Sequence, residues 1–166
     1  WGLSDNQHIL CLENNNYPDI LRQIVHSPPV LYVKGDLNTL NHQQLAIVGS
    51  RKPTYVGAEI ASDFARELAS LGVSICSGLA VGVDTSAHRG ALDALAKTVA
   101  VMGTGIDRIY PRSNRKLADQ IIAAGGALVS QFPLASQPKA AHFPLRNQVI
   151  SGLSLAVLVI EATRKS

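Results

Sequence analysis

Five short apolar runs rich in β-branched residues constrain the fold of this chain most strongly. They span residues 45–49, 73–77, 98–102, 127–132 and 155–160. They recur at intervals of about 25 to 30 residues, which is the spacing of strand–helix units. None of them alternates polar with apolar residues along its length, so we expect helices on both faces of a parallel sheet.

The segments between these runs have helical spacing. We expect helices over residues 57–71, 85–96 and 113–124, the first with Ile60, Phe64, Leu68 and Leu71 on one stripe. Strands that alternate with helices in this way predict an α/β fold with a doubly wound, mostly parallel sheet flanked by helices.

The first 44 residues do not show this regular alternation of strand and helix patterns. Residues 14–18 form a turn signal, residues 19–25 suit a short helix, and residues 30–33 suit a short strand. We expect residues 1–44 to be a lead-in segment that packs on the main domain. The main domain, residues 45–166, is expected to be incomplete at its C-terminus, because no covering helix follows its last strand.

Composition narrows the class of protein. Of the 166 residues, 46% are hydrophobic and 16% are charged, which is typical of a compact core. Cys11 and Cys76 are too far apart in sequence to suggest a disulfide or a metal pair. No leader-like segment opens the chain, and no apolar stretch reaches the roughly 18 residues that span a bilayer. We therefore expect a cytoplasmic protein without a membrane partner.

Positive charge is concentrated in the second half of the chain. Residues 1–93 hold six Lys or Arg against nine Asp or Glu, whereas residues 94–160 hold seven against two. This asymmetry suits a polyanionic partner, and it is equally consistent with a solvated cationic surface.

Ligands of open parallel sheets bind beyond the carboxyl ends of the strands. After the first run, Gly49 permits close approach of a ligand, Ser50 offers a hydroxyl, and Arg51 and Lys52 offer positive charge for phosphate. The alternative is that Arg51 pairs with a carboxylate and holds the loop.

The loop after the second run contains Gly78 and Gly82, whose spacing suits amides that face an anion. The alternative is a helix cap with glycine turns. Asp84 is then a structural or capping residue, and His88 a packed histidine rather than a metal ligand.

The two later loops add cations and aromatic rings. Arg112, Asn114, Arg115 and Lys116 surround an expected helix start, where cations oppose the helix dipole and phosphate binding would explain them. Arg146 and Asn147 are expected near the start of a helix that begins near residue 148. Tyr110 and Phe143 could stack on bases, or they could pack a loop and staple a helix.

Common enzyme signatures are missing. The chain has no Gly-x-Ser-x-Gly elbow, no Gly-x-Gly-x-x-Gly after the first run, no Walker motif and no Cys/His metal spacing. The sequence therefore predicts no catalytic residues, no cofactor and no bound metal.

Taken in order, five motifs resemble the DprA (Smf) family of bacterial DNA-processing proteins over residues 17–162. They are Leu45-Ala-Ile-Val-Gly-Ser-Arg51, Ser77-Gly-Leu-Ala-Val-Gly-Val-Asp84, Gly103-Thr-Gly105 with Ile109-Tyr-Pro111, Phe132-Pro-Leu134, and Phe143-Pro-Leu-Arg-Asn147. The chain departs from the family at Gln131, where Glu is usual, and at Gln148, where Arg is usual.

The resemblance implies a Rossmann-like domain that binds single-stranded DNA, protects incoming DNA and loads RecA during natural transformation, without known catalysis. It also implies that Arg51 and Lys116 contact DNA phosphates, with the loops at Gly49 and Gly78 forming the pocket between them. Family members continue beyond residue 166, and that part would be the place for a homodimer contact.

Two other hypotheses remain from the sequence. One is a nucleotide or nucleoside-monophosphate hydrolase of the lysine-decarboxylase-like Rossmann group, although the Pro-Gly-Gly-x-Gly-Thr-x-x-Glu motif of that group is missing here. The other is a partner-binding module whose pocket is vestigial.

Overall fold

A computed structural model describes residues 1, 2, 4 and 6–162. Its strands form one seven-stranded sheet. The strand order is β1-β2-β6-β5-β4-β3-β7, and β6, β5, β4, β3 and β7 run parallel. The strands are β1 (Gln7–Cys11), β2 (Val30–Gly35), β3 (Gln44–Gly49), β4 (Ser74–Ser77), β5 (Thr98–Val101), β6 (Ala127–Ser130) and β7 (Ala156–Ile160). All five predicted strands are present, within a few residues of their expected ends.

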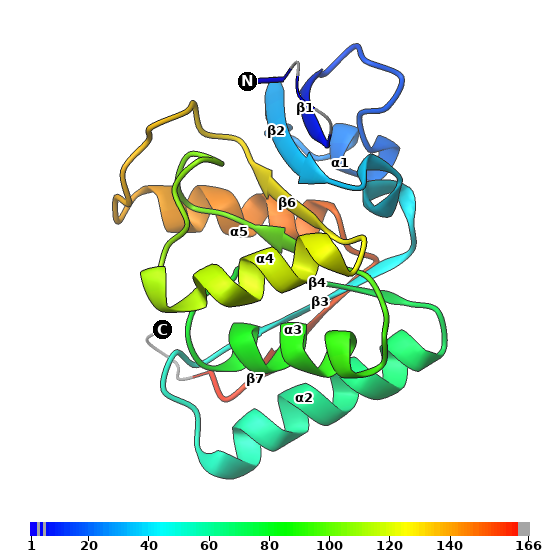
Figure 1. Ribbon diagram of the computed structural model, residues 1–166, viewed down its shortest axis with the longest axis vertical. Helices are drawn as coiled ribbons and strands as arrows, with labels where there is room; N and C mark the ends of the chain where they lie inside the picture. Colours follow the sequence, from blue (N-terminus) through cyan, green and yellow to red (C-terminus); the bar gives the residue numbers. More distant parts are fainter. Residues whose placement is uncertain (3, 5, 163–166) are drawn as a thin grey trace.

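Helices cover both faces of the sheet (Figure 1). The α-helices are α1 (Asp19–Arg22), α2 (Tyr55–Ser70), α3 (Val83–Asp93), α4 (Arg115–Ala123) and α5 (His142–Gly152), and the 3-10 helices are η1 (Leu37–Asn41) and η2 (Arg112–Asn114). From β3 to β6 the chain steps in one direction, with α2, α3 and α4 on one face. It then crosses the other face through α5 to place β7 beside β3. This reversal makes the sheet doubly wound and confirms the predicted Rossmann-like architecture.

The central strands are apolar on both faces because each face contributes to a separate core. Ala46 of β3 packs in a cluster with Val149 and Ile150 of α5, whereas its neighbour Ile47 packs with the α2–α3 layer. Successive residues of a strand point to opposite faces, so a strand covered on both sides must be apolar throughout.

The last strand is less covered than its sequence predicts. Leu155, Val157 and Val159 are exposed, and the described residues give β7 one neighbour, β3. The expectation of helices on both faces was wrong here, because α5 packs beneath β4 and β5: Ile150 lies in the core cluster that contains Cys76 and Val99.

Contrary to the prediction from the sequence, the buried face of helix α2 is not the face that carries its large apolar residues. Ile60, Phe64 and Leu71 are exposed, and the buried side of the helix consists of Gly57, Ala61, Ala65 and Ala69. Small residues let α2 approach α3 closely, where Ala87, Gly90 and Ala91 are buried in turn. A large apolar stripe marks a core face only where the neighbouring helix leaves room for it.

Replacing Gly90 with alanine is expected to destabilise the fold by about 1–3 kcal/mol. A Cβ at this position would overlap the backbone oxygen of Ser62 on α2 and would lie 3.0 Å from Cβ of Ala65. Chemical denaturation measures the effect, and Arg89→Ala, at an exposed position on the same helix, is the control and is expected to stay within about 0.5 kcal/mol. Equal stability of the two variants would contradict this helix contact.

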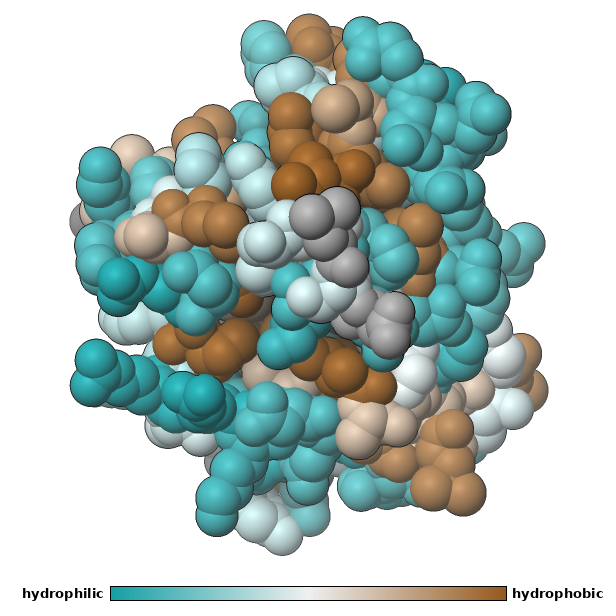
Figure 2. Space-filling view, turned by 45° about the horizontal axis from the view of Figure 1, so that its top comes forward, coloured by the Kyte–Doolittle hydropathy of each residue, from teal (hydrophilic) through white to brown (hydrophobic). Residues whose placement is uncertain are grey.

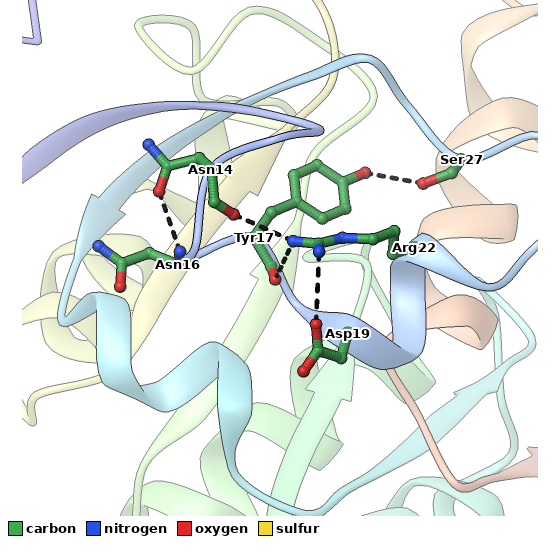
Figure 3. Close-up of polar contacts among 6 residues, drawn as sticks. All are labelled: Asn14, Asn16, Tyr17, Asp19, Arg22 and Ser27. Atoms are coloured by element: carbon green, nitrogen blue, oxygen red, sulfur yellow. Dashed lines mark hydrogen bonds and ion pairs between the residues drawn. The ribbon is translucent and has the colours of Figure 1, made fainter.

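The first 44 residues add two antiparallel strands to the β6 edge. β2 pairs with β6, and β1, which the sequence did not reveal, pairs with β2. Figure 3 shows polar contacts within the segment that connects β1 to β2. The buried Tyr17 hydroxyl donates to Pro28 O at 2.7 Å, and Arg22 Nη2 donates to Asn14 O at 3.0 Å. Burial raises the pKa of Tyr17 above its ordinary value.

The surface is mixed in character. Figure 2 shows one face on which hydrophilic residues cover much of the surface and hydrophobic residues form separate patches, both near the middle and at the lower right edge. Within residues 1, 2, 4 and 6–162, no helix is both long and apolar enough to cross a membrane.

Candidate nucleic-acid interface

Two adjoining hollows lie at the carboxyl edge of the sheet. The smaller, of about 80 Å³, is lined among others by Arg51, Gly78, Tyr110, Phe143 and Arg146. The larger, of about 580 Å³, shares Arg51 and Arg146 and adds residues of the β3 loop, the α5 residue Asn147 and the end of β7. The loops after β3, β4 and β5 therefore meet α5 here, as the sequence predicts.

The loop after β3 presents Arg51 to solvent. Its guanidinium carbon lies 5.2 Å from the centre of the Phe143 ring, and within the described part of the chain it forms no ion pair. The alternative reading of Arg51 as a carboxylate-paired loop residue is therefore not supported. Ser50 Oγ accepts a hydrogen bond from Lys52 N at 3.1 Å and shapes the turn.

Gly49 lies where β3 meets β7. A Cβ there would overlap the backbone oxygen of Ile160, and Ser50 N donates to that same oxygen at 3.2 Å. Gly49 thus permits the close approach of β7, and its contact with a ligand stays a prediction.

The loop after β4 is held by an internal anion. The amides of Gly78 and Ala80 donate to Asp84 Oδ2 at 3.1 and 3.2 Å. These two amides therefore bind the chain's own carboxylate, and contact of Gly78 and Gly82 with an external anion stays a prediction. Gly82 has φ +83°, a backbone conformation that favours glycine, and a Cβ there would overlap Ser50 O.

Asn114 braces the same loop from the opposite side. Its Nδ2 donates to Leu79 O at 2.9 Å, to Ala80 O at 3.2 Å and to Thr85 Oγ1 at 2.9 Å. Asn114 is buried, so its contact with DNA stays a prediction, and its position favours a bracing role.

Arg146 completes this brace. Its side chain is only 5% exposed, and Nη1 donates both to Gly78 O and, at 2.9 Å, to Val101 O. The sequence placed it at a helix start near residue 148, but α5 begins at His142. Arg146 therefore lies in the second turn and points into the fold. Its Nε donates to Asn147 Oδ1 at 3.0 Å.

Asp84 and Arg146 are coupled through burial and charge. Burial raises the pKa of the Asp84 carboxyl, and the Arg146 charge and the two loop amides counteract that rise. Burial lowers the pKa of Arg146, opposed by the Asp84 charge. Each charge thus offsets the cost of burying the other. The loop after β4 therefore has the Asp84 carboxylate against its N–H groups and the Arg146 guanidinium against its C=O groups.

Two aromatic rings form the open wall of the smaller hollow. The rings of Tyr110 and Phe143 lie 6.0 Å apart at 41°, and Tyr110 is 48% exposed. Phe143 also lies between two cations, Arg51 and Arg146, the latter at 5.9 Å. An aromatic surface beside an exposed arginine is a suitable platform for an unpaired base.

The remaining predicted cations are exposed. Lys52 and Lys116 lie on the surface, and Arg112 and Arg115 line a separate, larger hollow beside α4. All of these sequence-predicted contacts with DNA stay predictions.

One contact at the start of α5 was not predicted from the sequence. The His142 ring stacks on Phe132 with centroids 4.0 Å apart, and this contact anchors the first turn of α5. No motif marks that contact.

His88 is buried, as the packed-histidine interpretation expected, and its Nδ1 lies 2.8 Å from Thr98 Oγ1. Burial lowers the pKa of His88 to about 3, so it is neutral at physiological pH.

A metal centre finds no support in the described ranges. Nowhere in residues 1, 2, 4 and 6–162 do three His, Cys, Asp or Glu side chains gather as a metal ion requires.

Comparison with known proteins gives one consistent result. The model of the family described as DNA recombination-mediator protein A matches residues 8–166. Protein Smf of Escherichia coli K12 is 43% identical over the whole chain, which covers 44% of that protein. The chain thus spans less than half the length of this curated relative.

Two solved structures share the fold and the sequence. The X-ray structure of DNA processing protein A from Streptococcus pneumoniae has a TM-score of 0.90 at 37% identity, covering 98% of this chain and 56% of that one. A structure of DNA processing protein A from Helicobacter pylori, described for its unique single-stranded DNA binding mode, has a TM-score of 0.84 at 34% identity, covering 95% and 71%. On this evidence, the chain belongs to the DNA recombination-mediator protein A family, the DprA (Smf) family that its motifs resemble.

Proposed function

We propose that this chain binds single-stranded DNA at the carboxyl edge of its sheet, with little preference for sequence. The observation that carries the proposal is the exposed Arg51, unpaired within the described residues, beside the aromatic rings of Phe143 and Tyr110. A guanidinium binds phosphate in any sequence, and every base has a face that can stack on an aromatic ring. The single-stranded DNA binding described for the Helicobacter pylori relative supports the same ligand.

A titration of labelled oligothymidylate and of a matched duplex tests this function. Binding of the single strand with a steep salt dependence, and weaker binding of the duplex, is the expected result. A base stacked on the aromatic wall must be unpaired, which a duplex does not offer. Absence of binding to the single strand even at low salt would favour a vestigial pocket.

Arg51→Ala is expected to weaken binding of all single-stranded sequences alike and to lower the slope of log affinity against log salt by about 0.7. The loss of one phosphate contact releases one counterion fewer, whatever the bases are. Arg66→Ala removes the same charge from α2, where Arg66 pairs with Asp63 at 2.7 Å, and serves as the control. An unchanged slope in Arg51→Ala would remove Arg51 from the site.

We further propose that the complete protein protects incoming DNA, loads RecA during natural transformation and acts by binding rather than catalysis. The family membership supports this role. The surfaces for RecA and for a homodimer are proposed to lie in the part of the protein that its longer relatives share. Co-purification of RecA with the full-length protein but not with residues 1–166 would support that division.

The hydrolase alternative has a direct test. Release of free base from nucleoside monophosphates by this chain would overturn the binding-only proposal.

A further inference from the structure

A further hollow lies outside the site described so far. It has a volume of about 830 Å³, within the range of about 300–1,000 Å³ that is common for ligand sites. It lies beside α4, between that helix, the loop after β5 and strand β2. Its lining includes four cations: Lys34, Arg108, Arg112 and Arg115.

These four cations come from separate parts of the chain. Lys34 is on β2, where it pairs with Leu128 of β6, and the arginines come from the loop after β5 and from the start of α4. Within the described part of the chain, none of the four forms an ion pair. Such convergence of unpaired charge is unfavourable in the free protein and favourable with an anion.

Two carboxylates also line this hollow. Asp107 Oδ1 accepts a hydrogen bond from Ala135 N at 2.8 Å, so it holds the neighbouring loop. Asp119 lies on the exposed side of α4, one turn beyond Arg115. The lining therefore carries four positive and two negative charges, and its net charge of +2 still favours an anionic ligand.

The floor of the hollow is apolar. Ile106, Ile109, Ile122 and Leu128 contribute to it. An apolar floor below a basic rim suits a ligand with alternating bases and phosphates better than it suits a small inorganic anion.

The hollow adjoins the candidate DNA site at one residue. Tyr110 lines both this hollow and the smaller one at Phe143, and the segment after it leads directly to Arg112. A strand that stacks on the aromatic wall can therefore continue past Tyr110 along α4 towards Lys34.

We propose that this hollow, which we call the α4 channel, binds the phosphates of the same DNA strand where it leaves the aromatic wall. The proposal rests on the single-stranded DNA binding proposed above and extends it: the path of the strand runs from Arg51 past Tyr110 to Arg108 and Lys34.

Oligothymidylates of two lengths test the α4 channel. Single-strand-binding folds cover about 4–16 nucleotides, so one oligonucleotide is chosen at each end of that range. Lys34→Ala combined with Arg108→Ala is expected to lower the salt slope of the longer strand by about 1.4, which is about 0.7 for each lost phosphate contact. Binding of the shorter strand, which is held at the aromatic wall, is expected to stay unchanged.

Three controls separate the outcomes. Lys34→Arg keeps the charge and should keep the slope, and Arg66→Ala removes a distant charge. Circular dichroism of each variant establishes that the fold is intact. An unchanged slope for the longer strand, or an equal loss for both lengths, would overturn the channel while leaving the proposed function standing. Failure of the unmodified chain to bind either strand would overturn both.

A free nucleotide is the competing occupant. Saturable binding of thymidine monophosphate or inorganic phosphate that disappears in the double variant, without an effect on the longer strand, would assign the hollow to a small anion and overturn the proposal.

Discussion

Arg146→Met is expected to lower the free energy of unfolding by about 3–5 kcal/mol, because it leaves a buried carboxylate without its cation. Asp84 is buried beside the β4 loop, and the backbone oxygens of Gly78 and Val101 would lose their donor. Methionine retains much of the apolar volume of the side chain, so the loss reports on charge and hydrogen bonding. Urea denaturation at neutral pH measures it.

The same variant should lose stability in a pH-dependent way. Without Arg146, burial raises the pKa of Asp84 further above its unfolded value. A group with a raised pKa contributes stability below its unfolded pKa, near 4, and loses that contribution as the pH rises through its folded pKa. The difference between Arg146→Met and the unmodified chain should therefore be smallest near pH 4 and grow towards pH 8.

A double-mutant cycle provides the control for this pair. Adding Asp84→Asn to Arg146→Met removes the unpaired charge, so it should recover part of the lost stability and flatten the pH dependence. A loss that is the same at pH 4 and pH 8 would show that Arg146 contributes through its hydrogen bonds and packing, and not through its charge beside Asp84.

Phe143→Leu is expected to weaken single-stranded DNA binding by about tenfold to a hundredfold, which corresponds to roughly 1–3 kcal/mol of stacking on one base. Leucine keeps an apolar side chain next to Arg51 but offers no flat face. The salt slope should stay the same, because no phosphate contact is removed. Fluorescence anisotropy with oligothymidylate at several salt concentrations gives both quantities.

Matched variants make this result specific. Phe143→Tyr keeps the ring and should keep most of the affinity. Phe64→Leu removes a half-exposed ring from α2, outside the hollows, and should have no effect. If Phe143→Leu lowered the salt slope as Arg51→Ala does, Phe143 would act by positioning Arg51 and not by stacking.

The architecture was largely predictable because it depends on burial. Apolar runs without alternation favour strands covered on both faces, and their spacing leaves room for one helix between each pair. The errors came where burial depends on the neighbour. Phe64 and Val159 are as apolar as core residues, yet α2 packs through alanines and β7 lies at the sheet edge within the described residues.

The meeting of the loops at the candidate site was predictable, whereas the orientation of their side chains was not. The loops after β3, β4 and β5 had to meet at one edge, because parallel strands share their carboxyl ends. Which polar groups turn outward was not predictable. Arg51 and Arg146 both follow a glycine or proline closely in the sequence, but one is exposed and the other braces Gly78. That difference depends on the start of α5, which lies six residues earlier than the sequence indicated.

The braced loop after β4 has a thermodynamic consequence for association. Its amides, its carbonyls and the strained Leu79, at φ +59°, are already held by Asp84, Arg146 and Asn114 before any ligand arrives. Ordering a loop on binding normally subtracts from affinity, and this loop has no such ordering left to undergo. The entropy cost of complex formation then falls on the incoming strand and on exposed side chains such as Arg51. Preformed sites of this kind capture flexible ligands by rigid-body encounter, without a conformational step of their own.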